Sequence, residues 1–137
     1  VVAVLEVPPE DTHRYGVIVP GEENGALVEI KGLVEKPPQG SAPSNLMLPG
    51  RYILQPEVMR ALDAQETGAG GEIQLTDAMA KLIGEQPFHG FRFSGKRYDC
   101  GDNVGFVIGN IALALGRDDV GPKVREYLAG LGDGARH

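Results

Sequence analysis

Residues 15–38 read YGVIVPGEENGALVEIKGLVEKPP, and this stretch predicts a β-hairpin. An apolar segment over 15–20 leads into polar residues that end in Asn24 and Gly25, a pair that favours tight hairpin turns. The segment 26–36 then alternates apolar and polar residues over its first half, as a strand with one buried face does. Two prolines follow directly, so we expect the second strand to end there.

The composition limits the classes of protein to which this chain can belong. The chain has 137 residues, 42% hydrophobic and 23% charged, which is typical of a globular domain with a modest core. A net charge of -6 without any Lys/Arg cluster argues against a nucleic-acid partner. We find no signal peptide and no apolar run long enough to span a membrane. The single cysteine rules out an internal disulfide and fits a reducing compartment, so we expect a cytoplasmic protein.

The segments around the hairpin predict a mixture of strands and helices. Further strands are expected over 1–7, 50–54 and 88–95, a loop over 39–45, and helices over 56–65, 72–86, 102–117 and 118–132. A glycine-rich stretch at 67–71 interrupts the helical pattern. The fold class is therefore α/β, with helices concentrated toward the C-terminal end.

Opposite charges stand side by side where the predicted hairpin ends, at Glu35 and Lys36. Ligands of open α/β sheets bind at the ends of strands. A carboxylate accepts hydrogen bonds from sugar hydroxyls, and an ammonium group suits a phosphate as a point charge. This pair can therefore hold the two ends of a sugar phosphate, and the alternative is an ordinary solvated strand end.

Three further residues are candidates for either binding or structure. Glycine inside a strand, as at Gly16, marks a bulge or the close approach of another backbone or a ligand. Asp99 and Asp102 lie in the glycine-flanked segment GKRYDCGD, and Mg²⁺ commonly takes one or two carboxylates together with substrate phosphate oxygens. The alternative is that Asp102 caps the following helix while Asp99 is a turn residue.

Five segments, taken in order, resemble one enzyme family. They are RYGVIVP, LVEKP, SNLMLPGRYIL, GEIQLTDA and GKRYDCGD, and together they resemble the bacterial UTP–glucose-1-phosphate uridylyltransferases (UDP-glucose pyrophosphorylases). The resemblance covers almost the whole chain. GEIQLTDA and YDCGD are specific to this branch, whereas VEKP is shared among sugar-nucleotide pyrophosphorylases. It implies the C-terminal part of a Rossmann-like three-layer α/β/α nucleotidyltransferase, with a mixed sheet followed by helices.

The resemblance also implies a reaction. The phosphate of glucose 1-phosphate would attack the α-phosphorus of UTP, releasing pyrophosphate and UDP-glucose, with Mg²⁺ offsetting charge; such chemistry depends on positioning and electrostatics. Glu35 would hold glucose hydroxyls, and Lys36 would bind the sugar phosphate as a catalytic residue. Gly16 would lie against the glucose through its backbone. Asp99 matches the position at which related thymidylyltransferases place a carboxylate on the metal.

Two features of the resembled family have no match here: a glycine-rich triphosphate loop followed by a basic residue, and a first metal carboxylate. We therefore expect residues 1–137 to form the sugar-phosphate side of an enzyme whose UTP is bound by an absent N-terminal half. The chain alone should be inactive.

Two alternatives to this function stay open. One is another hexose-1-phosphate nucleotidyltransferase, such as a thymidylyltransferase, and the other is a non-catalytic sugar-phosphate-binding or assembly module. We also expect a homo-oligomer, since an open strand edge invites pairing and the related enzymes associate through C-terminal helices.

Overall fold

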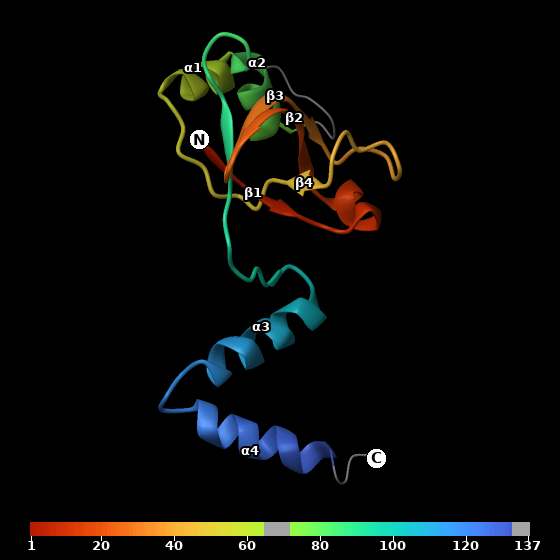
Figure 1. Cartoon of the computed structure of the whole chain (residues 1–137), viewed down its shortest axis with the longest axis vertical. Coiled ribbons are helices and arrows are strands. Elements are labelled where there is room, and N and C mark those ends of the chain that lie inside the picture. The colour runs from red at the N-terminus through yellow and green to blue at the C-terminus, as the bar shows by residue number, and fades with distance from the viewer. Residues whose placement is uncertain (65–71, 133–137) are drawn as a thin grey trace. The chain divides into compact units, whose positions relative to one another are not determined.

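The computed structural model of the chain describes residues 1–64 and 72–132. They belong to two compact units, Val1–Ser94 and the part that begins at Gly95. The strands and the first two α-helices make up the first unit, and two longer helices belong to the second (Figure 1). The glycine-rich stretch 67–71 lies outside the described residues.

The predicted hairpin is present, and its first strand is longer than expected. Strand β2 (Gly16–Asn24) pairs antiparallel with strand β3 (Leu27–Glu35). The polar residues 21–24 therefore belong to the strand, and the turn consists of Gly25 and Ala26 alone. Gly25 has a φ of 60°, which explains why glycine follows asparagine at this position.

An irregularity around Pro20 allows the strand to continue past a proline. The register of the hairpin shifts on both sides of this residue. Proline has no N–H for the sheet, so it is tolerated inside a strand mainly at such bulges. The N–H of Glu22, just beyond the proline, donates to the side chain of Glu29 at 3.1 Å and so remains hydrogen-bonded.

Five strands of two to nine residues close into a small barrel in the order β1-β4-β2-β3-β5. Strand β1 (Val2–Glu6) runs parallel to β5 (His89–Arg92) and antiparallel to β4 (Leu46–Met47). The sheet is therefore mixed, and together with the helices it confirms the predicted α/β class. The three-layer α/β/α arrangement stays a prediction.

The strand expected over 50–54 is wrong. These residues form no strand. They contribute an isolated bridge between Tyr52 and Val2, with backbone hydrogen bonds from Ala3 to Arg51 and from Ile53 to Val1. The place between β1 and β2 is taken by β4 instead, which pairs with both. Since β4 is two residues long, it offers no alternation from which a strand could be predicted.

Helices close one end of the first unit. Helices α1 (Glu57–Asp63) and α2 (Leu75–Leu82) lie beside one another there, and the 3-10 helix η1 (Pro9–Arg14) connects β1 to β2 (Figure 1). Helix α2 is shorter than the predicted 72–86, because the chain is extended at residue 83 and turns at residue 84 with a φ of 97°.

The core of the first unit joins the barrel to α2. Met79 of α2 and Phe88, which precedes β5, pack against apolar side chains from the strands. The buried members of this cluster are Val2, Val4, Ile18, Val28, Ile30, Leu46, Leu48, Met79 and Phe88. One face of α2 is therefore fixed against the barrel. This packing also fixes the position of the residues in the first turn of the helix.

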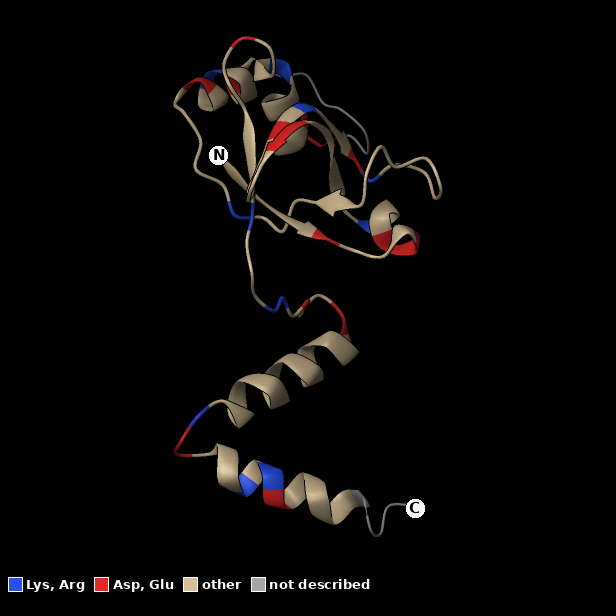
Figure 2. Cartoon of the chain, in the orientation of Figure 1, with Lys and Arg blue, Asp and Glu red and all other residues tan. Residues whose placement is uncertain are grey.

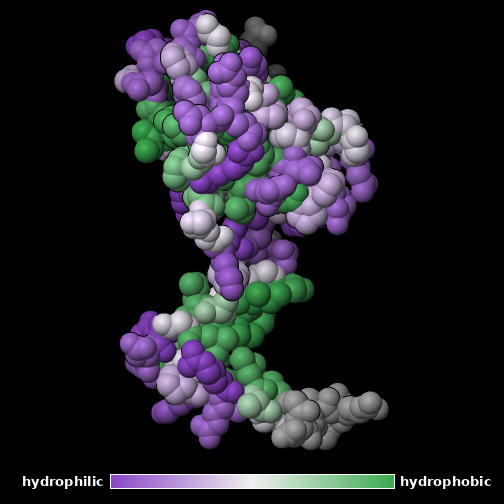
Figure 3. All heavy atoms as spheres, in the orientation of Figure 1, coloured by the Kyte–Doolittle hydropathy of each residue, from purple (hydrophilic) through white to green (hydrophobic). Residues whose placement is uncertain are grey.

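The second unit contains two helices, α3 (Asn103–Leu115) and α4 (Gly121–Gly132). Both were expected, and Asp102 caps α3 by accepting a hydrogen bond from the N–H of Gly105 at 2.7 Å. No charged side chain lies on α3 (Figure 2). Its surface is strongly hydrophobic (Figure 3), and five large apolar side chains are more than half exposed: Val104, Phe106, Val107, Ile108 and Leu113.

Within residues 1–64 and 72–132, no helix is both long enough and apolar enough to cross a membrane.

Replacing Gly90 by alanine should destabilise the barrel. A Cβ atom there would lie 2.8 Å from Val4 Cγ1 and 2.9 Å from Val28 Cγ1. We expect a loss of about 1–3 kcal/mol in the free energy of unfolding, as in overpacked cores. Urea denaturation measures it. The neighbouring Phe91 is 46% exposed, so Phe91→Tyr should change stability by less than about 0.5 kcal/mol. Equal effects of the two substitutions would contradict this packing.

Candidate functional site

Gly16 and Glu35 lie directly opposite one another where the hairpin ends. A Cβ atom on Gly16 would lie 2.9 Å from Glu35 Oε2. The register is regular at this pair and shifts only further along the hairpin, so Gly16 is not at a bulge. The group that approaches Gly16 is the side-chain carboxylate of Glu35, and the predicted approach of a ligand to this glycine stays a prediction.

A residue of α2 completes this contact. The Thr76 hydroxyl donates a hydrogen bond of 2.6 Å to Glu35 Oε2, and Thr76 is only 7% exposed. A hydrogen bond from a hydroxyl to a carboxylate is among the stronger side-chain contacts in proteins. The sequence prediction did not single out Thr76. Its signal is the helical spacing, since Thr76 precedes the buried Met79 by three residues and so faces the barrel.

Tyr52 lies in the electrostatic field of the same carboxylate. Burial of the phenol and the nearby charge of Glu35 both raise the pKa of Tyr52, burial being the larger cause. Leu48 adds an apolar wall, because its Cδ1 would be 3.5 Å from a Cβ on Gly16. Glu35 therefore lies in a partly buried setting built from β2, β3, α2 and the segment after β4.

Lys36 leaves the strand in an uncommon backbone conformation. Its φ is 44°, and it is the one non-glycine residue with positive φ in the part of the chain that the structure describes. Its N–H still donates to the Tyr15 carbonyl at 3.1 Å, and the next residue, Pro37, is fully buried. The chain is thus held firmly on both sides of Lys36, which keeps a strained residue in place.

The side chain of Lys36 is exposed. Among residues 1–64 and 72–132, none forms a hydrogen bond or ion pair with its ammonium group. A lysine held in strained backbone next to a fixed carboxylate can offer its charge to an anionic ligand.

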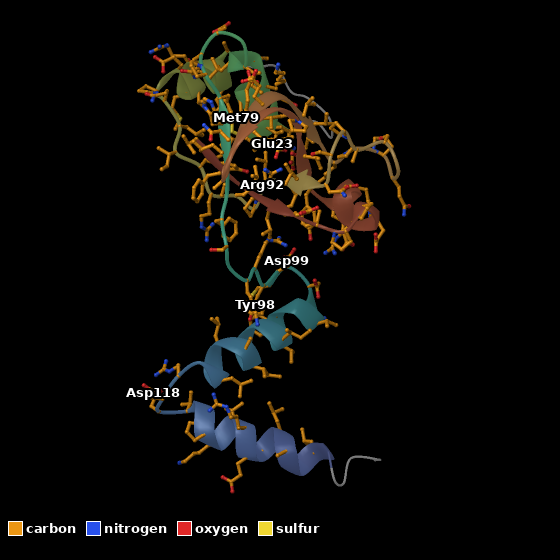
Figure 4. All side chains as sticks on the ribbon, in the orientation of Figure 1. Glu23, Met79, Arg92, Tyr98, Asp99 and Asp118 are labelled. Atoms are coloured by element: carbon orange, nitrogen blue, oxygen red, sulfur yellow. The ribbon has the colours of Figure 1, made fainter. Side chains whose placement is uncertain are left out.

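Asp99 belongs to the second unit, in the segment that leads into α3 (Figure 4). Its Oδ2 accepts a hydrogen bond of 2.8 Å from Arg97, and its Oδ1 accepts one of 3.0 Å from the N–H of Gly101. Asp102 is the cap of α3, as one of the two interpretations of this segment proposed. The structure therefore brings Gly16, Glu35 and Lys36 together in the first unit.

The donor set near Asp99 fits a shared metal ligand better than a closed metal site. No group of three or more His, Cys, Asp or Glu residues that could hold an ion occurs within the described ranges. A single carboxylate of 30% side-chain exposure is the type of ligand that Mg²⁺ accepts beside waters and phosphate oxygens. Its ion pair with Arg97, which the sequence did not predict, would share the carboxylate with such an ion.

A groove lies elsewhere on the first unit. It has a volume of about 820 Å³ and is lined by β2, β3 and the segment 83–89. None of Gly16, Glu35 and Lys36 lines it. The candidate site is therefore defined by its contacts at the end of the hairpin and not by this hollow.

Comparison with known proteins identifies the family. Residues 1–121 match the nucleotidyl transferase family, so the chain belongs to that family of enzymes.

Within it, the chain is similar to UTP–glucose-1-phosphate uridylyltransferases. It is 56% identical over 104 residues to the one from Komagataeibacter xylinus, a match that covers 76% of this chain and 37% of that protein. It is 44% identical over 131 residues to the one from Bacillus subtilis strain 168, covering 96% of this chain and 45% of that protein. The chain thus spans less than half the length of these relatives.

Solved structures agree with this placement. A UDP-glucose pyrophosphorylase complexed with UDP-glucose is 40% identical and superposes with a TM-score of 0.80, covering 85% of this chain and 44% of that one. A UTP-bound UGPase from Acinetobacter baumannii is 32% identical with a TM-score of 0.82, covering 95% of this chain and 45% of that one. The family resemblance predicted from the sequence motifs is confirmed.

Two substitutions of Lys36 should separate its backbone strain from its charge. Left-handed backbone costs a non-glycine residue roughly 1–2 kcal/mol, part of which glycine loses again through its freedom in the unfolded chain. Lys36→Gly should therefore stabilise the protein by about 0.5–1 kcal/mol in urea denaturation. Lys36→Ala removes the same charge and keeps the strain, so it should not stabilise. Equal stability of the two variants would show that the conformation at φ 44° carries no strain.

Proposed function

We propose that this chain is the sugar-phosphate side of an enzyme that makes UDP-glucose and pyrophosphate from UTP and glucose 1-phosphate. The observation that carries the proposal is the arrangement of Gly16, Glu35 and Lys36 at one hairpin end. The similarity to UTP–glucose-1-phosphate uridylyltransferases supports it. In a full-length enzyme of this kind, we expect the barrel to form part of a Rossmann-like three-layer α/β/α domain that also binds UTP.

Each residue of the hairpin end has a proposed role toward glucose 1-phosphate. Glu35 accepts hydrogen bonds from sugar hydroxyls, because an ionised carboxylate is an acceptor only. Lys36 binds the phosphate and, as the catalytic residue, stabilises the charge that develops as this phosphate attacks the nucleotide. Gly16 lets the sugar approach the backbone, since any side chain there would occupy the space beside Glu35.

We propose Mg²⁺ as the cofactor, with Asp99 as one of its ligands. When bound, the ion offsets negative charge on the reacting phosphates. Within this chain, Arg97 and the N–H of Gly101 orient the Asp99 carboxylate. Asp102 caps α3, and Asp99 is taken as the ligand because its position matches that of a metal carboxylate in related thymidylyltransferases.

We also propose that the protein is a homo-oligomer in the cytoplasm. The exposed apolar side chains of α3 support association, because patches of this kind usually mark interaction sites. The free Cys100 is in keeping with a reducing compartment.

Binding of glucose 1-phosphate by the chain tests the assignment of the sugar-phosphate side. In calorimetry, Lys36→Ala should lower the affinity at least about tenfold, corresponding to roughly 1.4 kcal/mol for the lost charge contact. The matched control is Lys31→Ala on the same strand, whose ammonium pairs with Glu29 at 3.5 Å; it should leave the affinity within about twofold. Equal losses in both variants would indicate general electrostatics, and no binding by the unaltered chain would favour a purely structural or assembly role.

The isolated chain should form no UDP-glucose from UTP and glucose 1-phosphate in the presence of Mg²⁺. Its residues supply contacts for the sugar phosphate, while the family's triphosphate loop has no counterpart in the sequence. Chromatographic detection of UDP-glucose measures the outcome, with a full-length relative as the positive control. Formation of UDP-glucose from UTP by the chain alone would contradict the proposal that the chain supplies only the sugar-phosphate side of the enzyme. Product from TTP in preference to UTP, in an enzyme containing this segment, would favour the thymidylyltransferase alternative.

A further inference from the structure

The buried hydroxyl of Thr76 is committed to one acceptor. Thr76 and Glu35 are 41 residues apart in sequence, and their contact is a side-chain hydrogen bond of 2.6 Å. Thr76 is the second residue of α2, so no earlier turn of the helix offers its hydroxyl a carbonyl. Here it donates across to β3 instead. Because Thr has a single O–H and an ionised carboxylate can only accept, the direction of this bond is fixed.

Because of this bond, the two carboxylate oxygens of Glu35 have different roles. Oε2 accepts from Thr76 and would lie 2.9 Å from a Cβ on Gly16. The same Cβ position is 3.5 Å from Thr76 Oγ1, so the hydrogen bond passes directly over the glycine. A glutamate side chain has several rotatable bonds, and this contact removes much of that freedom before any ligand arrives. Oε1 takes no part in this bond and can accept from a ligand.

We propose that Thr76 is a positioning residue that orients the Glu35 carboxylate toward the hydroxyls of the hexose. This inference rests on the proposed function and extends it from β3 to α2. The packing of Met79 against the barrel holds α2 in place, and so it holds the Thr76 hydroxyl over Gly16. Specificity for the sugar thus depends on a residue that need not touch it.

Two variants of Thr76 test the proposal by NMR titration of the full 137-residue chain. Thr76→Val keeps the shape of the side chain and removes the hydroxyl. It should lower the affinity for glucose 1-phosphate about tenfold, which corresponds to the loss of one hydrogen bond to a charged group. Thr76→Ser restores the hydroxyl and should recover the affinity to within about threefold. Inorganic phosphate, which lacks sugar hydroxyls, should bind both variants as it binds the unaltered chain. In a Glu35→Ala background, Thr76→Val should cause no further loss.

Urea unfolding provides a readout that needs no ligand. The effects of Thr76→Val and Glu35→Ala on the unfolding midpoint should be less than additive, since either one removes the same bond. Unchanged glucose 1-phosphate affinity in Thr76→Val would overturn the positioning role and leave the proposed function standing. If Thr76→Val lost affinity for inorganic phosphate as much as for glucose 1-phosphate, Thr76 would have a structural role only. Failure of the unaltered chain to bind glucose 1-phosphate would overturn the proposed function, and the positioning role with it, even if the unfolding effects are coupled.

Discussion

The antiparallel pairing of β2 with β3 is the constraint on which the candidate site depends. Its register places Gly16 opposite Glu35, and a shift of one residue would turn the carboxylate to the other face of the strand. The same two strands also form part of the barrel wall, so burial of Ile18, Val28 and Ile30 fixes that register. The packing of apolar residues inside the barrel therefore determines where a charged group lies at its rim.

Much of this hairpin could be predicted from the sequence, because its signals are local. Alternation and the Asn24–Gly25 pair predict two strands joined by a tight turn. The hairpin is present, and its turn lies one residue later, at Gly25 and Ala26. The start of α3 is visible in the same way, because aspartate is a favoured N-cap residue and Asp102 caps this helix in the structure. The family motifs were recognisable too, because they are short segments of fixed residues.

The features that sequence reasoning missed depend on contacts between distant segments. β4 is a strand only because β1 and β2 lie on either side of it. Thr76 becomes part of the site only once α2 packs on the barrel and brings its hydroxyl to Glu35. Lys36 adopts a left-handed conformation that is normally expected of glycine or asparagine, and nothing in its local sequence indicates this. Such features follow from the tertiary structure. Helical spacing indicates that Thr76 faces the barrel, but it does not indicate that its hydroxyl meets Glu35.

The parallel contact between β1 and β5 has a consequence for how this protein is made. Val2 pairs with Gly90, so β1 cannot gain this neighbour until the chain has been synthesised as far as β5. At about 5–20 residues per second, the wait lasts roughly 5–20 seconds. During that time the edge of β1 that faces β5 has no partner, and an unpaired strand edge can join strands of other chains. The unpaired edge of β1 is therefore a point at which aggregation can begin before residue 92 has been synthesised.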